Sequence, residues 1–245
     1  MAALAKRLPL LALTLLISGC VSPVSSNGGG TVSYSASPEL TGRLCKPQGP
    51  GPFPAVIFHH GGLGAIIGGA PGETCQALSQ AGYVGFAPIR RKTRSLHGHL
   101  DDVSAALDFV KSVPGVDASR IGLIGFSRGA MLAYQFVAGR QDIDALVLMA
   151  AAAGRRGDGL TSVDAGSVAA PILMLVADND TGSRTTMGGD VKSHMTELAA
   201  LLKAAGRRHR LIIYPAHGSD GHQLFFDVGA YWPDVTAFLD RHLKR

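Results

Sequence analysis

The segment GFSRG, residues 125–129, holds a serine between two glycines in the spacing of a nucleophile on a sharp turn. A serine hydroxyl is a poor nucleophile near neutral pH, so Ser127 needs a base to accept its proton and an acid to orient that base. The chain contains 32 glycines in 245 residues, so an ordinary turn serine is the alternative. The flanks favour a nucleophile, because an apolar run ends at the first glycine and helix-forming residues follow the serine.

Acidic residues and histidines that could complete such a site follow later in the chain. Asp178 and Asp180 come directly after an apolar run, and His217 and His222 follow the next one. An aspartate in a turn can also bond its own backbone, and a histidine can lie beside a site without acting in it. The residue types alone therefore leave two candidates for each role.

The elements that must position these residues are short apolar runs separated by helical segments. Near-continuous apolarity without alternation indicates strands that are covered on both faces. Strand and helix alternate, which predicts an α/β fold with a mainly parallel sheet and helices on both sides. Ligands bind such sheets at the carboxyl ends of the strands, where the polar candidates fall. The predicted strands are 55–60, 83–89, 121–126, 145–150, 172–177 and 210–215, and the predicted helices include 100–113, 130–138 and 191–206.

From about residue 40 onward, four segments in order resemble the dienelactone hydrolase-like branch of the α/β-hydrolase superfamily. They are GPFPAVIFHHGG, DDVSAALDFVKSVPGVDASRIGLIGFSRGAML, PILMLVADND and YPAHGSDGHQLF. The resemblance implies the α/β-hydrolase fold and a chain order of serine, acid and histidine. The domain has little spare sequence for a large lid.

The resemblance also separates the candidates for acid and base. In that family the acid usually follows a G-x-x-D turn, and here Ala177 stands in place of the glycine, which indicates Asp180 over Asp178. The histidine usually lies in a GH pair followed by apolar or aromatic residues, which matches GHQLFF and indicates His222 over His217.

Acyl transfer also needs donors for the negative charge that develops on the carbonyl oxygen. The resemblance implies that one donor is the backbone amide of Arg128, directly after the nucleophile. The second is expected in the turn HHGGLG, at Gly62, with Leu63 as the alternative donor. A merely flexible glycine turn is the other interpretation of this segment.

These residues predict a cofactor-free serine hydrolase that cleaves a carboxylic ester or a similar small acyl substrate through an acyl-enzyme. Dienelactone hydrolases themselves carry a cysteine nucleophile, and Ser127 stands in its place here, which favours a carboxylesterase over a dienelactone-specific enzyme. The alternatives are a non-catalytic envelope lipoprotein that retains the fold, and an acyltransferase that uses the same triad.

The first residues of the chain predict export. A basic start at Lys6 and Arg7, an apolar core and small residues before a cysteine indicate a secretory signal that is too short to span a membrane. The segment ISGC resembles the bacterial lipobox, in which Cys20 would be lipidated, and Val21 resembles the residue found in outer-membrane lipoproteins. An ordinary signal peptide in which Cys20 has no role is the alternative.

The expected organisation is a signal peptide over 1–19, a flexible Ser/Gly/Pro tether over 20–37 and one α/β-hydrolase domain over 38–245. The domain would be attached to the bacterial outer membrane through Cys20 and would face the periplasm. Removal of 1–19 takes away two cations and lowers the formal net charge from +5 to +3, which is too mild to indicate nucleic-acid binding.

The remaining cysteines and the histidine and arginine clusters leave smaller questions open. Cys45 and Cys75 could form a disulfide in an exported chain, or could be two separate thiols. No Cys, His and Asp set has the spacing of a zinc site, so His59 and His60 are expected to line a turn. The basic segment RRKTR, 90–94, is expected to be a solvated loop, although it could steer anionic substrates.

Overall fold

The computed structural model describes residues 29–155 and 158–244, without the side chains at 155 and 158. The predicted signal peptide and the predicted lipidation site Cys20 lie outside these residues. Within the described part of the chain, no helix is both long enough and apolar enough to cross a bilayer.

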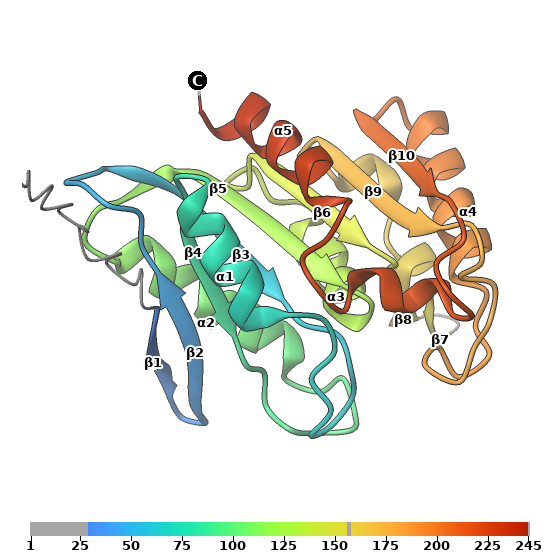
Figure 1. Cartoon of the computed structure of the whole chain (residues 1–245), viewed down its shortest axis with the longest axis horizontal. Helices are drawn as coiled ribbons and strands as arrows, with labels where there is room; N and C mark the ends of the chain where they lie inside the picture. Colours follow the sequence, from blue (N-terminus) through green and yellow to red (C-terminus); the bar gives the residue numbers. More distant parts are fainter. Residues whose placement is uncertain (1–28, 156–157, 245) are drawn as a thin grey trace, which may run out of the picture.

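The centre of the molecule is an eight-stranded sheet with the strand order β1-β2-β4-β3-β5-β6-β9-β10 (Figure 1). The strands from β4 to β10 run parallel to one another, whereas β1 and β2 form an antiparallel edge. This arrangement confirms the prediction of a mainly parallel sheet. The strands are β1 (Gly30–Ala36), β2 (Glu39–Cys45), β3 (Phe53–His59), β4 (Val84–Pro88), β5 (Val116–Phe126), β6 (Ala145–Met149), β9 (Ile172–Ala177) and β10 (His209–Tyr214), with the short pair β7 (Gly154–Arg155) and β8 (Asp158–Gly159) forming a separate hairpin.

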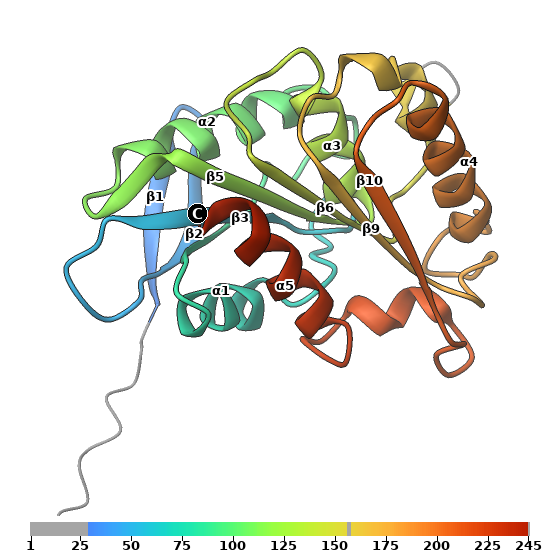
Figure 2. The same ribbon diagram turned by 90° about the horizontal axis from the view of Figure 1, so that it is seen from above.

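Helices cover both faces of this sheet, as predicted (Figure 2). Burial from both sides explains why β6 and β9 are apolar throughout and buried at every residue. Helices α1 (Pro71–Gln80) and α5 (Trp232–Leu243) lie on one face, and α2 (His99–Ser112), α3 (Arg128–Val137) and α4 (Val191–Ala204) lie on the other.

Each of the six predicted strands is present, but the antiparallel edge was not predicted. Strand β1 lies within the segment expected to be a tether, so the predicted boundary at residue 38 was placed too late. Most of β1 is exposed, which explains why it was not predicted. Its buried residue is Tyr34, whose ring centroid lies 5.5 Å from that of Phe86. A strand that buries so little has no apolar run to reveal it.

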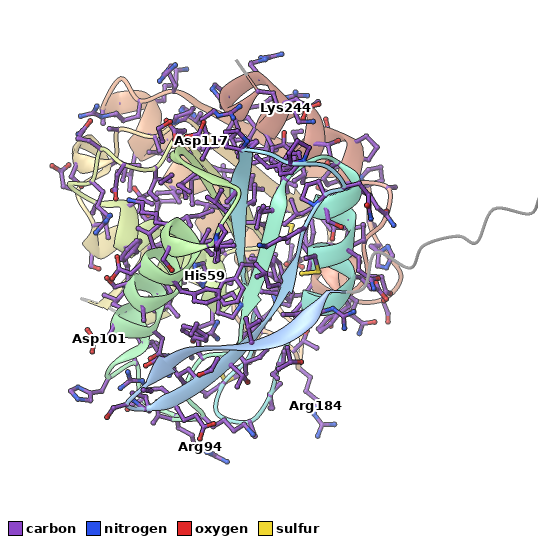
Figure 3. All side chains as sticks on the ribbon, turned by 90° about the vertical axis from the view of Figure 1, so that its left-hand side faces the viewer. His59, Arg94, Asp101, Asp117, Arg184 and Lys244 are labelled. Atoms are coloured by element: carbon purple, nitrogen blue, oxygen red, sulfur yellow. A yellow bond between two sulfur atoms is a disulfide. The ribbon has the colours of Figure 1, made fainter. Side chains whose placement is uncertain are left out.

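The sheet brings distant loops to one end of the molecule. Figure 3 shows Arg94, from the loop after β4, and Arg184, from the loop after β9, at the same end. Asp117, at the start of β5, and Lys244, after α5, lie at the opposite end. The end with Arg94 and Arg184 is therefore the carboxyl end of the parallel strands, where ligand sites of such sheets form.

A disulfide joins Cys45, the last residue of β2, to Cys75 in α1, with their Cα atoms 5.6 Å apart. The sequence left this pairing open. The bond ties the antiparallel edge to the helix that covers it.

Candidate active site

Ser127 lies on a strained turn between β5 and α3. Its backbone has φ 52° and ψ −116°, a conformation that non-glycine residues rarely adopt. The turn is held by backbone hydrogen bonds, because Ser127 N–H donates to Met149 O at 2.9 Å and Ala152 N–H donates to Ser127 O at 3.0 Å. Strain that neighbouring elements maintain in this way is typical of functional sites.

The glycines on either side of this serine are required by close backbone contacts. A Cβ atom added to Gly125 would lie 2.4 Å from the Cα atom of Ala130. At Gly129 it would lie 2.0 Å from the carbonyl oxygen of His59. Both distances are far below van der Waals contact, so only glycine fits at these two positions of the G-x-S-x-G spacing.

The structure brings Asp180 and His222 together next to this turn. Nδ1 of His222 lies 2.8 Å from Oδ2 of Asp180, and the two residues are 3% and 1% exposed. The imidazole packs against the ring of Phe126, the residue before the serine, with ring centroids 4.8 Å apart. The carboxylate can therefore orient the histidine beside the serine turn.

Two local features bring His222 back toward Asp180. Gly221 approaches the turn at Asp180 so closely that an added Cβ atom would lie 2.6 Å from Asp180 N. Asp220 caps the short 3₁₀ helix Gly221–Phe225 by accepting the His222 N–H at 3.1 Å, and it accepts the hydroxyl of Thr185 at 2.6 Å. The glycine in the GH pair thus permits the approach, and Asp220 anchors the loop.

The other two candidates lie elsewhere. Asp178 is exposed and forms an ion pair with Lys192 at 2.9 Å. His217 is also exposed, and its backbone N–H donates to the side chain of Asn179 at 2.9 Å. Neither is placed in the contact that joins Asp180 and His222.

The glycine turn after β3 lies directly against the serine. A Cβ atom added to Gly61 would lie 3.1 Å from Cβ of Ser127 and 2.9 Å from Cδ1 of Phe126, so a glycine favours this close approach. Gly62 has φ +85°, which also favours glycine. Arg128 is the first residue of α3, and the first amides of a helix point out of its N-terminus, where they can bind an anion. The two segments expected to donate to an oxyanion therefore border Ser127.

Beneath this turn lies a buried network that the sequence did not predict. The main-chain N–H of Arg90 donates to Nε2 of His60 at 3.2 Å, and the Arg90 guanidinium donates to the carbonyl oxygen of His60. Nδ1 of His60 in turn donates to the carbonyl oxygen of Gly61 at 2.6 Å. The expectation of a solvated basic loop is wrong for Arg90, which is 4% exposed. Because Arg90 belongs to a run of cations, the sequence pattern did not distinguish it from exposed residues of the loop.

The electrostatics of this region keep both adjacent histidines neutral. Burial, followed by the positive charge of Arg90, lowers the pKa of His59 to about 3 and that of His60 to about 3. Burial and the nearby charge of Arg128 lower the pKa of Arg90 to about 10. Near neutral pH, His60 is therefore an uncharged imidazole that donates through one nitrogen and accepts through the other.

The described residues contain no group of three or more His, Cys, Asp or Glu side chains that could hold a metal ion.

Comparison with known proteins places this arrangement in a family. Residues 90–219, more than half of the chain, match the dienelactone hydrolase family. The matched range includes Ser127 and Asp180 and ends just before His222. A curated relative, the uncharacterised peptidase YtmA of Bacillus subtilis, is 31% identical over 110 residues, which are 42% of this chain and 42% of that protein.

Solved structures with the same fold include esterases and peptidases. An esterase from the archaeon Pyrobaculum calidifontis has a TM-score of 0.70 at 17% identity, and the match covers 86% of this chain and 85% of the esterase. A carboxylesterase from a metagenomic library has a TM-score of 0.70 at 17% identity over 91% of both chains.

A larger protein also shares the fold. The dipeptidyl peptidase 4 of Porphyromonas gingivalis has a TM-score of 0.66 at 19% identity, and 89% of this chain covers only 36% of that enzyme. The chain is thus an α/β-hydrolase that belongs to the dienelactone hydrolase family.

Proposed function

We propose that the protein is a serine hydrolase that cleaves a carboxylic ester through an acyl-enzyme, with Ser127 as nucleophile, His222 as base and Asp180 as the residue that orients the base. The observation that carries the proposal is the buried contact between Asp180 and His222 beside the strained turn of Ser127. A carboxylate on Nδ1 of a histidine leaves Nε2 as the proton acceptor, which is the tautomer that serine activation requires.

In the first half of this reaction, Ser127 Oγ forms a bond to the carbonyl carbon while its proton passes to Nε2 of His222. Negative charge moves onto the carbonyl oxygen, where the amides of Arg128 and Gly62 would stabilise it. Collapse breaks the bond to the leaving alcohol, which takes the proton from His222. In the second half, a water molecule gives a proton to His222 and its oxygen bonds to the acyl carbon. Collapse then breaks the bond from that carbon to Ser127 Oγ, which takes the proton back from His222, and the carboxylic acid is released.

A peptide or other amide is the second candidate substrate. It is favoured by the 31% identity to a relative described as a peptidase, and the same triad serves both reactions. A 4-nitrophenyl ester and a 4-nitroanilide that carry the same acyl group would distinguish an esterase from a peptidase. Hydrolysis of the anilide at a comparable kcat/KM would favour a peptidase, whereas turnover of the ester alone would favour an esterase.

The decisive test of the reaction class is labelling with a fluorophosphonate probe. Wild-type protein should be labelled and should hydrolyse short-chain aryl esters, and Ser127→Ala should do neither. A folded wild-type protein that shows neither reaction would favour the non-catalytic alternative. Transfer of the acyl group to an added alcohol, in preference to water, would favour an acyltransferase.

We also propose that the protein is exported and anchored through a lipid on Cys20. The sequence around Cys20 supports this proposal, and so does the Cys45–Cys75 disulfide, because such bonds persist mainly in oxidising compartments. Metabolic labelling with a radioactive fatty acid should mark the wild-type protein and leave Cys20→Ala unmarked. A wild-type protein without label would exclude the anchor.

A further inference from the structure

We infer that His60 and Arg90 are positioning residues that aim the amide of Gly62 at the oxyanion, an inference that rests on the proposed hydrolase function. It concerns the buried network beneath the glycine turn. The residues of this network have no part in the proton transfer itself.

The argument begins with the geometry of the peptide that joins Gly61 to Gly62. A trans peptide is planar, so its C=O and N–H point in opposite directions. The carbonyl oxygen of Gly61 accepts two hydrogen bonds, from Nδ1 of His60 at 2.6 Å and from the N–H of Gly68 at 3.1 Å. Because these donors hold the carbonyl, they also fix the direction of the Gly62 N–H, which is opposite to it. The segment borders the nucleophile, since a Cβ atom added to Gly61 would lie 3.1 Å from Cβ of Ser127.

The preceding peptide is held in the same way. The carbonyl oxygen of His60 accepts a hydrogen bond from the Arg90 guanidinium, and the N–H of Gly61 donates to Gly68 O at 2.9 Å. A rotation of the glycine turn about the bonds that lead to Gly62 would break these hydrogen bonds. A longer contact of 3.5 Å joins the guanidinium to the carbonyl oxygen of Gly62 itself.

Arg90 also decides which nitrogen of His60 carries the proton. Its main-chain N–H donates to Nε2 of His60, so that nitrogen must be unprotonated and the proton lies on Nδ1. Only this tautomer can donate to Gly61. The low pKa of His60, about 3 through burial and the charge of Arg90, keeps the ring in the neutral form that the arrangement needs.

The burial of Arg90 supports a specific role. Within residues 29–155 and 158–244, no ion pair to a carboxylate is formed by Arg90, whereas its neighbour Arg91 binds Asp102 at 2.6 Å. A guanidinium that is 4% exposed and bonded to backbone carbonyls is unfavourable unless those bonds are needed. Within the part of the chain that the structure describes, the guanidinium donates to the carbonyl oxygens of residues 60 and 62 of the glycine turn, and its Nε has no hydrogen-bond partner.

The test compares an ester with the corresponding thionoester, in which sulfur replaces the carbonyl oxygen. Sulfur is a weak hydrogen-bond acceptor, so a well-aimed amide favours the ester, and the ratio of the two kcat/KM values measures its alignment. In His60→Leu, kcat for the ester should fall by about 10- to 100-fold with little change in KM, and the ester-to-thionoester ratio should fall by about tenfold. His60→Asn, whose amide can replace Nδ1 as donor, should restore both within about threefold.

Arg90→Lys provides a second route if His60→Leu does not fold, because it keeps the charge and loses the planar fork. It should also lower the ratio. Lys92→Met, which removes an exposed cation from the same loop, is the matched control and should leave the ratio unchanged.

Equal losses on ester and thionoester, with the ratio unchanged in both His60→Leu and Arg90→Lys, would overturn the inference and indicate a role in folding alone. Unchanged activity in these variants would overturn it as well. A wild-type protein that is neither labelled by the fluorophosphonate nor active on the ester would instead overturn the proposed hydrolase. The two failures are therefore distinguishable.

Discussion

His222 and Asp180 are 42 residues apart in the chain, yet Nδ1 of the histidine lies 2.8 Å from Oδ2 of the aspartate, and both side chains are buried. An isolated carboxylate in such a place would be strongly unfavourable without this hydrogen bond. The pairing leads directly to predictions about which residues turnover depends on.

The first prediction separates the two histidines. His222→Ala should lower kcat by on the order of 10³-fold or more, because the serine would lose the group that accepts its proton. His217→Ala should lower kcat by at most about tenfold, since its ring is exposed and its backbone makes the hydrogen bonds to Asn179. Steady-state kinetics on an aryl ester, with melting temperatures as the folding control, would check this. An inactive His217→Ala beside an active His222→Ala would contradict it.

The second prediction concerns the acid. Asp180→Asn should lower kcat by about 10⁴-fold, because an amide can donate to Nδ1 and stabilise the wrong tautomer of His222. Asp178→Asn is the matched control, since it breaks an exposed ion pair with Lys192 that contributes little to stability. Comparable loss of activity in the two variants would show that Asp180 has no special role.

The third prediction concerns stability and pH. Because the pKa values of His59 and His60 are about 3 in the folded protein and about 6.5 when unfolded, unfolding takes up protons between these values. The free energy of unfolding should therefore be fully retained above pH 6.5 and should fall as the pH is lowered toward 3. The slope should approach about 1.4 kcal/mol per pH unit for each histidine.

Urea unfolding at several pH values between 4.5 and 6.5 would measure this slope. His59→Gln should lower the slope of the free energy of unfolding against pH by about 1.4 kcal/mol per pH unit, the contribution of one histidine. This change is expected whatever the effect of the substitution on absolute stability. Identical slopes for the variant and the wild type would refute the assignment to His59.

The fourth prediction concerns the disulfide. Reduction should lower the free energy of unfolding by about 3 to 4 kcal/mol, the loop-closure value for the 30-residue separation of Cys45 and Cys75. Urea unfolding with and without a reductant would measure it. A Cys45→Ala, Cys75→Ala double variant should no longer respond to the reductant, and a continued response would contradict the assignment.

The fifth prediction concerns the serine turn. Gly129→Ala should destabilise the fold by at least about 2 to 3 kcal/mol, because the new methyl group meets the His59 carbonyl at 2.0 Å. Gly30→Ala, with no atom within 4 Å of its added Cβ, is the control and should change stability by less than about 0.5 kcal/mol. Melting temperatures would check both, and similar values for the two variants would refute the steric argument.

The sequence by itself determined the parallel part of the sheet, because strands buried on both faces leave continuous apolar runs such as ILMLVA. It also indicated the serine turn, because Gly125 and Gly129 flank Ser127 in the G-x-S-x-G spacing. Gly125 lies against the nearby Ala130, whereas Gly129 lies against His59 at the end of the distant strand β3. For the proposed acid and base, the resemblance to the family's motifs indicated Asp180 and His222, which are the two side chains that the structure joins.

Only the tertiary structure decided the features that depend on contacts between distant segments. Strand β1 buries one face at a sheet edge, so its sequence carries little apolar signal. The disulfide depends on how closely β2 and α1 approach, which spacing along the chain does not encode. Arg90 looked like one more cation in a basic loop, and it is buried because the end of β4 lies next to the turn after β3. Burial and hydrogen-bond partners are properties of packed neighbours, and those neighbours are set when the sheet assembles.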